Sequence, residues 1–142
     1  MTQENACELC SGAGGEVLVQ NAEWRVILVD DAHYPGFCRV VWNAHAAEMT
    51  ELVPAQRSSL MQAVCKVEQA LRDVMQPAKI NLASLGNMVP HLHWHVIPRY
   101  RDDAHFPNPI WGTATHAPDA AALAARRALL PQLRQTLISR LS

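Results

Sequence analysis

Residues 90–97 read PHLHWHVI and place three of the chain's seven histidines, His91, His93 and His95, at alternate positions. In a β-strand, alternate side chains point to the same face, so the three imidazoles share one face and the apolar residues between them share the other. Burying three imidazoles has a desolvation cost unless they are paired. The sequence therefore predicts a strand with one core face, whose histidines either form an exposed row or line a site.

Two chemistries use a row of imidazoles on one strand. A His-x-His pair can supply two neutral nitrogens to a zinc ion that takes its other ligands from elsewhere. Alternatively, one imidazole can attack phosphorus while its neighbours hold phosphate oxygens or a leaving group. The flanking sequence favours the second, because Gly86 and its turn can present backbone N–H groups to an anion and no carboxylate lies in residues 85–90.

The rest of the chain predicts an α+β fold rather than alternating βαβ units. We expect strands over residues 16–20, 24–30, 37–43, 80–86 and 91–99, the first three forming an antiparallel meander. Residues 6–16 are expected to be a loop. Between Pro54 and Met75 the apolar residues are spaced by four and three, which predicts one covering helix. A second helix is expected over residues 119–141, with Pro131 as a kink or break.

Composition limits the class of protein. The 142 residues, 49% of them hydrophobic, predict a single domain over residues 1–142. The 12 basic and 13 acidic residues are interspersed, and the formal net charge is −1, so no nucleic-acid partner is expected. No segment approaches the roughly 20 apolar residues of a membrane span, and the N-terminus does not resemble a leader. We therefore expect a cytoplasmic protein without a membrane partner, in which Cys38 and Cys65 are buried thiols.

The run His91-Leu92-His93-Trp94-His95-Val96-Ile97, with a helix, a strand and a Gly-containing turn before it, carries a family resemblance. It resembles the signature of the histidine-triad (HIT) superfamily of nucleotide hydrolases and transferases, in particular the diadenosine polyphosphate hydrolases and phosphoramidases. The resemblance covers about residues 7–100. It implies a five-stranded antiparallel sheet with one main covering helix, and usually a homodimer whose two sheets join. Residues 101–142, with an additional C-terminal helix, are an extension that we expect to wrap the dimer or cap the site.

The resemblance implies a role for each histidine. His93 matches the nucleophile that attacks the α-phosphorus of a dinucleoside polyphosphate or nucleoside phosphoramidate and forms a nucleotidyl-histidine. His95 is expected to donate a hydrogen bond to the α-phosphate and leaving group, and His91 to fix the geometry. An imidazole with a pKa near 6.5 is neutral at pH 7 and needs no separate base, so no cofactor is expected in catalysis. A non-catalytic nucleotide-binding or regulatory module, and a metal-dependent protein that uses the triad itself, remain alternatives.

Further positions match the family less closely. Asn81 and Asn87 correspond to polar residues near the phosphate or leaving group, and Asp30, rather than Asp31, to the acid that holds the ribose hydroxyls. The expected substrate-binding set is Asp30, Asn81, Asn87, Met88 and Val89.

Several residues depart from the family or lie outside its core. Met88 stands where many relatives carry Ser or Thr, and Phe37 where many carry His, which changes the expected substrate preference. Arg99 and Arg101 follow the triad strand and are expected either to meet a polyphosphate tail or to be solvated. Trp111 is expected to pack or, less favoured, to stack on a base.

A Cys-x-x-C motif near the N-terminus offers a second site. In some HIT relatives such a motif joins a histidine after the third strand and the first triad histidine to hold zinc, and here the corresponding residues are Cys7, Cys10, His45 and His91. This possible structural zinc would anchor the N-terminal segment and orient the triad strand. A thioredoxin-like redox role is disfavoured, because the motif is not expected to open a helix after a strand.

Overall fold

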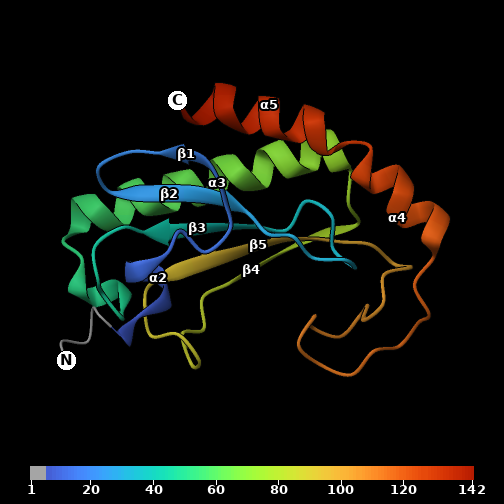
Figure 1. The fold of residues 1–142 in the computed structure, drawn as a ribbon, viewed down its shortest axis with the longest axis horizontal. Helices are drawn as coiled ribbons and strands as arrows, with labels where there is room; N and C mark the ends of the chain where they lie inside the picture. The colour runs from blue at the N-terminus through green and yellow to red at the C-terminus, as the bar shows by residue number, and fades with distance from the viewer. Residues whose placement is uncertain (1–5) are drawn as a thin grey trace.

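The computed structural model describes residues 6–142 and contains a five-stranded antiparallel sheet (Figure 1). The strands are β1 (Glu16–Gln20), β2 (Trp24–Leu28), β3 (Cys38–Trp42), β4 (Lys79–Ala83) and β5 (His93–Arg99), in the order β1-β2-β3-β5-β4. This confirms the predicted α+β class and the meander of the first three strands. The limits differ in detail, since β4 ends at Ala83 rather than Gly86 and β5 begins at His93 rather than His91.

Helix α3 (Pro54–Met75) covers one face of the sheet with the predicted bounds. Pro54 occupies the first turn, where its missing N–H has no intrahelical partner to lose. The apolar stripe of the helix is buried through Leu60, Val64, Val67 and Leu71. The same core contains the apolar residues of β5 and its approach, Leu92, Trp94 and Val96, so the predicted core face of the triad strand is confirmed.

The predicted C-terminal helix is two helices, α4 (Ala120–Arg127) and α5 (Leu130–Leu141). Asp119 caps α4, because its Oδ1 accepts the N–H groups of Ala121 and Ala122. The break before α5 agrees with the expected effect of Pro131, which lies in the first turn of that helix and lacks the N–H that an uninterrupted helix needs. Helix α5 packs against α3 through Leu133 and Leu137.

The structure corrects two predictions, one for the N-terminal loop and one for the burial of Cys65. The predicted loop contains a short helix, α2 (Glu8–Ser11), whose Leu9 packs with Ile27 and Val41 on the sheet face opposite α3. Cys38 is buried as expected, but Cys65 is exposed, because it lies on the solvent side of α3 next to the buried stripe.

A short 3₁₀ turn, η1 (Met49–Glu51), precedes α3. Within residues 6–142 no helix is long and apolar enough to cross a bilayer.

Candidate active site

The three triad histidines are buried, with His91, His93 and His95 only 0%, 8% and 5% exposed. The alternative of a plain exposed row is therefore wrong. The rings of His93 and His95 meet edge to face with centroids 4.8 Å apart, and both line one cavity on the sheet face opposite α3. Buried imidazoles at a cavity require partners, and each of the three rings has one in this structure.

The hydrogen bond of His93 defines its tautomer. Nδ1 lies 2.6 Å from the carbonyl oxygen of His91. A carbonyl can only accept, so Nδ1 carries the proton and Nε2 keeps a free lone pair. Burial lowers the pKa of His93 from its usual value near 6.5, while the bond to His91 raises it and the charge of Arg39 lowers it further, with a net decrease. His93 is therefore neutral at pH 7, with the lone pair that a nucleophile needs.

The ring of His95 is held by Arg39, a residue whose importance is not evident from the sequence. Arg39 and His95 are direct partners across β3 and β5, and Arg39 Nε donates to His95 Nδ1 at 3.3 Å. Burial, with smaller effects from His93 and Arg39, lowers the pKa of His95 to about 3. Because Nδ1 of His95 accepts the hydrogen bond from Arg39, the neutral ring carries its proton on Nε2. In the sequence FCRVVWN, Arg39 reads as an ordinary polar residue of a strand, because only the strand register reveals its partner.

The cavity beside the two histidines has a volume of about 480 Å³, which lies in the range of small-ligand sites. It is lined by Glu8, Leu9, Gly14, Arg39, Leu85, Gly86, Asn87, Met88, Val89, His93, His95 and Trp111. Three members of the expected substrate-binding set, Asn87, Met88 and Val89, are therefore brought to the triad. Met88 is 94% exposed and lies at the rim.

The turn over residues 86–89 forms one wall of this cavity. Gly86 has a φ of +74°, a left-handed conformation that glycine adopts at low cost. The backbone N–H groups of Gly86, Asn87, Met88 and Val89 donate to no acceptor within the described part of the chain. Successive unpaired N–H groups in a turn form a concavity that favours anions. The turn that the sequence predicted to bind phosphate therefore lines the same cavity as His93 and His95, and its anion-binding role stays a prediction.

The structure does not bring the other two expected substrate residues to this cavity. Asp30 lines a separate groove with Glu16 and Arg134, whereas its neighbour Asp31 acts electrostatically on Arg39. Asn81 accepts a hydrogen bond from Arg99 at 2.7 Å. The ribose and phosphate roles of Asp30 and Asn81 stay predictions.

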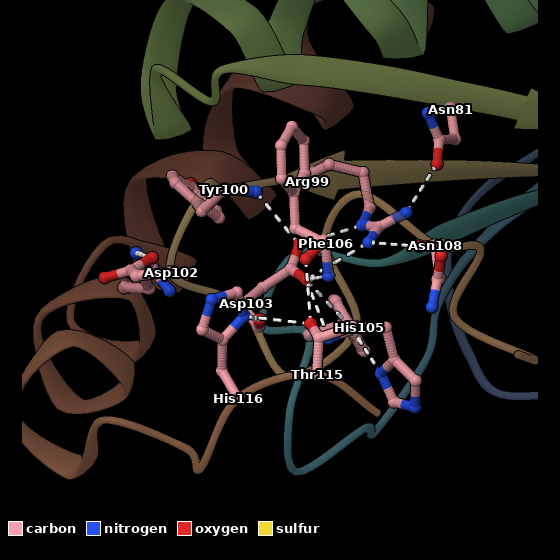
Figure 2. Close-up of polar contacts among 12 residues, drawn as sticks. Asn81, Arg99, Tyr100, Asp102, Asp103, His105, Phe106, Asn108, Thr115 and His116 are labelled. Atoms are coloured by element: carbon pink, nitrogen blue, oxygen red, sulfur yellow. Dashed lines mark hydrogen bonds and ion pairs between the residues drawn. The ribbon is translucent and has the colours of Figure 1, made fainter. Parts of the chain in front are cut away.

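Arg99 is neither solvated nor directed at the cavity, which corrects both expectations for this residue. Its side chain is 2% exposed and forms a two-point ion pair with Asp103, through Nε at 2.8 Å and Nη2 at 3.1 Å (Figure 2). Arg99 also donates to the Asn108 carbonyl at 2.7 Å. Asp103 in turn accepts the backbone N–H groups of Tyr100, His105 and Phe106. Arg101 is exposed, which agrees with the predicted alternative that it is solvated.

This ion-pair network fixes the first part of the C-terminal extension at the end of β5. Tyr34 adds to it, because its hydroxyl lies 3.3 Å from Asp103 Oδ1 and 2.6 Å from His105 Nδ1. The segment held in this way carries Trp111, whose ring centroid lies 4.9 Å from that of His95. Trp111 is 51% exposed and lines the cavity, so it forms part of the site wall rather than of the core.

A second cluster lies at the start of the triad strand and unites the four predicted metal ligands. One possible ligand atom from each of Cys7, Cys10, His45 and His91 lies within 4.8 Å of the others. His91 Nδ1 is 3.3 Å from Cys7 Sγ and 3.4 Å from Cys10 Sγ, and His45 Nδ1 is 3.3 Å from Cys10 Sγ. His91 Nε2 lies 2.6 Å from the Trp42 carbonyl oxygen and must donate to it, which leaves Nδ1 unprotonated toward the two sulfurs.

This donor set fits a tetrahedral metal ion. Two thiolates and two imidazoles are a common complement of structural sites, and the Trp42 carbonyl supplies the outer hydrogen bond that ligating histidines usually make. The Cys-x-x-C motif opens a short helix, α2, but within the described residues no strand precedes it, as the sequence predicted. The metal interpretation therefore has geometric support that the redox interpretation lacks.

Comparison with known proteins assigns the family. The sequence model of the HIT-domain family matches residues 13–102, which is more than half of the chain, so the chain belongs to this family. A solved histidine triad protein from Bradyrhizobium japonicum has a TM-score of 0.70 and 28% identity, over 88% of this chain and 90% of that one. This confirms the HIT-like fold expected from the sequence.

Two curated relatives carry names that refer to nucleotides. The chain is 30% identical over 74 residues to an asymmetrical bis(5'-nucleosyl)-tetraphosphatase of Schizosaccharomyces pombe, over 49% of this chain and 41% of the relative. It is 29% identical over 85 residues to an AP-4-A phosphorylase of Mycobacterium tuberculosis, over 56% of this chain and 44% of the relative. The chain thus spans less than half the length of either relative.

Proposed function

We propose that this protein is a nucleotide hydrolase or nucleotidyl transferase that cleaves at the α-phosphate of a dinucleoside polyphosphate or nucleoside phosphoramidate. The observation that carries the proposal is the unprotonated Nε2 of His93 at a cavity that is also lined by residues 86–89, whose backbone N–H groups have no acceptor among the described residues. A lone pair facing an anion site is what an attack on phosphorus requires. The names of the two curated relatives support the same class of substrate.

The reaction proceeds in two displacements at phosphorus. His93 Nε2 attacks the α-phosphorus, a P–N bond forms, and the bond from the α-phosphorus to the leaving group breaks with its electron pair on the leaving atom. His95 Nε2–H donates a hydrogen bond to that atom, which departs as a polyphosphate anion or takes up a solvent proton as an amine. Water or another acceptor then attacks the same phosphorus, the P–N bond breaks with its electron pair on His93 Nε2, and the proton of the attacking group goes to solvent. With water, a dinucleoside tetraphosphate gives one nucleoside monophosphate and one nucleoside triphosphate.

Turnover of diadenosine tetraphosphate in ¹⁸O-labelled water tests this route. The label should enter AMP and be absent from ATP, because water attacks only the α-phosphorus of the nucleotidyl-histidine. Label in ATP would mean attack at the β-phosphorus and would refute the proposed route. Binding without any products would instead favour the alternative of a nucleotide-binding HIT module.

The acid side of the pH profile follows from the state of His93. Protonation removes the lone pair on Nε2, and burial moves the pKa of His93 below its usual value. We therefore expect kcat/KM to stay level as pH falls from 8 through 6.5 and to decline only at lower pH. Initial rates in buffers of constant ionic strength measure this, and a decline centred above pH 6.5 would contradict the expected state of His93.

We propose that Cys7, Cys10, His45 and His91 hold a structural zinc ion. Bound zinc would cross-link the N-terminal segment to the residues before β5, and Glu8 and Leu9, which lie between the two cysteines, line the cavity. We expect about one zinc per chain in purified protein, and a loss of metal and a lower unfolding midpoint in Cys10→Ser.

Cys65→Ser is the matched control, because Cys65 is exposed on α3 and is not one of the four proposed metal ligands. Elemental analysis and thermal unfolding compare the two variants. Equal metal content in both would contradict the proposed ligands. Catalysis should persist in EDTA for as long as the protein stays folded, because no bond-making step uses the metal.

We further propose a cytoplasmic homodimer joined at the edge strand β4. The sheet order leaves β4 at an edge, and Leu82 and Leu85 in and after it are exposed. Unpaired edges with apolar side chains favour pairing with another strand. Sedimentation velocity should give twice the monomer mass, and Leu82→Lys should shift the distribution toward the monomer.

A further inference from the structure

One charged side chain of the cavity has no role in the chemistry described so far. Arg39 lies on β3, directly opposite His95 on β5, and lines the cavity together with both pocket histidines. Its Nε donates to His95 Nδ1 at 3.3 Å. Among the described residues, this is the one hydrogen bond that the His95 ring makes. The other close neighbours of the ring are the aromatic rings of Phe37, His93 and Trp111.

We propose that Arg39 is a positioning residue that holds the proton of His95 on Nε2 and thereby makes His95 a hydrogen-bond donor to the leaving group. A guanidinium has donors and no acceptor, so the nitrogen that faces it must be unprotonated. The other tautomer would set the Nδ1–H of His95 against the Nε–H of Arg39. It would also present a lone pair to the leaving atom, where negative charge develops. This inference rests on the proposed reaction at His93.

The surroundings of the pair make the control of the tautomer effective. Phe37 and Trp111 approach the His95 ring at centroid distances of 5.6 and 4.9 Å, and neither side chain carries a nitrogen or oxygen acceptor for a ring N–H. Arg39 itself lies over the Phe37 ring, with Cζ 5.3 Å from its centroid, which restrains the guanidinium next to His95. The cross-strand register therefore fixes the donor, and the described residues give Nδ1 of His95 no other hydrogen-bond partner.

The consequence for catalysis depends on the leaving group. A hydrogen bond from His95 matters most when the departing atom is a poor leaving group with strong charge development, such as an alkylamine or alkoxide. It matters little for 4-nitrophenolate, which departs unaided. A residue that acts only through His95 must therefore affect the two kinds of substrate unequally, whereas a general loss of folded structure lowers both rates together.

The kinetic test compares Arg39→Met with the wild-type protein on an adenosine 5'-alkylphosphoramidate and on the 4-nitrophenyl ester of AMP. We expect kcat to fall by on the order of 100-fold with the first substrate and by less than about 3-fold with the second, since a misplaced catalytic tautomer is costly. Arg39→Lys, which keeps a donor, should recover part of the loss. Arg140→Met, which removes an exposed arginine on α5, is the matched control and should leave both rates unchanged.

Two further measurements separate this inference from the proposed function. In His95→Ala protein, Arg39→Met should cause no additional loss with the alkylphosphoramidate, because the two residues act as a unit. Long-range ¹⁵N–¹H NMR of the His95 ring reads the tautomer without any turnover. The wild type should show the proton on Nε2, and Arg39→Met a mixture of tautomers. An unchanged Nε2–H tautomer in Arg39→Met, or equal losses on both substrates, overturns the role of Arg39; absence of turnover in the wild type overturns the proposed function instead.

Discussion

Replacing His93 by alanine is expected to lower kcat/KM for diadenosine tetraphosphate by at least about 10³-fold, because no other group can form the covalent intermediate. Its ring supplies the one unprotonated imidazole nitrogen that the hydrogen bonds of the triad leave free in the cavity. His91 donates Nε2–H to Trp42 and directs Nδ1 at the cysteines, and His95 directs Nδ1 at Arg39. Initial rates with product analysis measure the loss.

His33→Ala is the matched control for this variant. His33 is exposed and does not line the triad cavity, so its removal should leave the rate unchanged. His93→Gly with added imidazole provides a second check, because free imidazole can occupy the vacated space and supply the attacking nitrogen. A His93→Ala protein that keeps a tenth or more of the wild-type rate would contradict the role of His93.

Asp103→Asn is expected to destabilise the protein by about 3–5 kcal/mol, the usual cost of removing one partner of a buried ion pair. Asp103 is 4% exposed and accepts from both Arg99 nitrogens and from three backbone N–H groups (Figure 2). An asparagine amide would leave Arg99 buried without its counter-charge. Chemical denaturation monitored by tryptophan fluorescence measures the change in the free energy of unfolding.

Two companion variants keep this prediction testable if Asp103→Asn does not fold. Tyr34→Phe removes a single hydroxyl from the same network and should cost about 1 kcal/mol. Asp73→Asn breaks an exposed pair with Arg140 and should leave the unfolding midpoint essentially unchanged. Similar losses of unfolding free energy in Asp73→Asn and Tyr34→Phe would mean that burial does not determine how much the Arg99 network contributes to stability.

The same network predicts a dependence on pH. Burial raises the pKa of Asp103, but Arg99 and the backbone donors lower it more, to about 2. In the unfolded chain the group titrates near 3.9. A carboxyl whose pKa is lower in the folded state contributes its full stabilisation above about pH 4 and loses it as pH falls toward 2. The difference in stability between wild type and Asp103→Asn should therefore shrink below pH 4.

The elements with a strong local pattern were predictable from the sequence. The four-three spacing of α3 and the alternation in HLHWHVI each follow from a fixed periodicity of the backbone, so both gave the correct element and the correct buried face. The His91–Cys7–Cys10 cluster was predictable only through the family resemblance, because its members lie 84 and 81 residues apart.

The roles that the sequence did not reveal depend on burial or on contacts between segments far apart in the sequence. Arg39 acquires its partner from the β3–β5 register, which no local pattern specifies. Arg99 was interpreted as a surface or phosphate-binding residue, although its counter-charge Asp103 lies only four residues later, because the sequence does not show that both side chains are buried. Trp111 reaches the cavity from the extension, which Arg99 contacts through Asp103 and the Asn108 carbonyl. In each case tertiary packing, rather than local propensity, decides the role.

Intact-mass spectrometry of the protein mixed briefly with an adenosine 5'-phosphoramidate or diadenosine tetraphosphate, and then quenched in base, tests the nucleotidyl-His93 intermediate most directly. Phosphorus–nitrogen bonds to imidazole survive base better than acid, so the adduct should be preserved. The proposed mechanism predicts one added adenylyl group per chain in the wild type, located at His93 by peptide analysis and absent from His93→Ala. Turnover to AMP together with an adduct on another residue, or with the same adduct in His93→Ala, would contradict it.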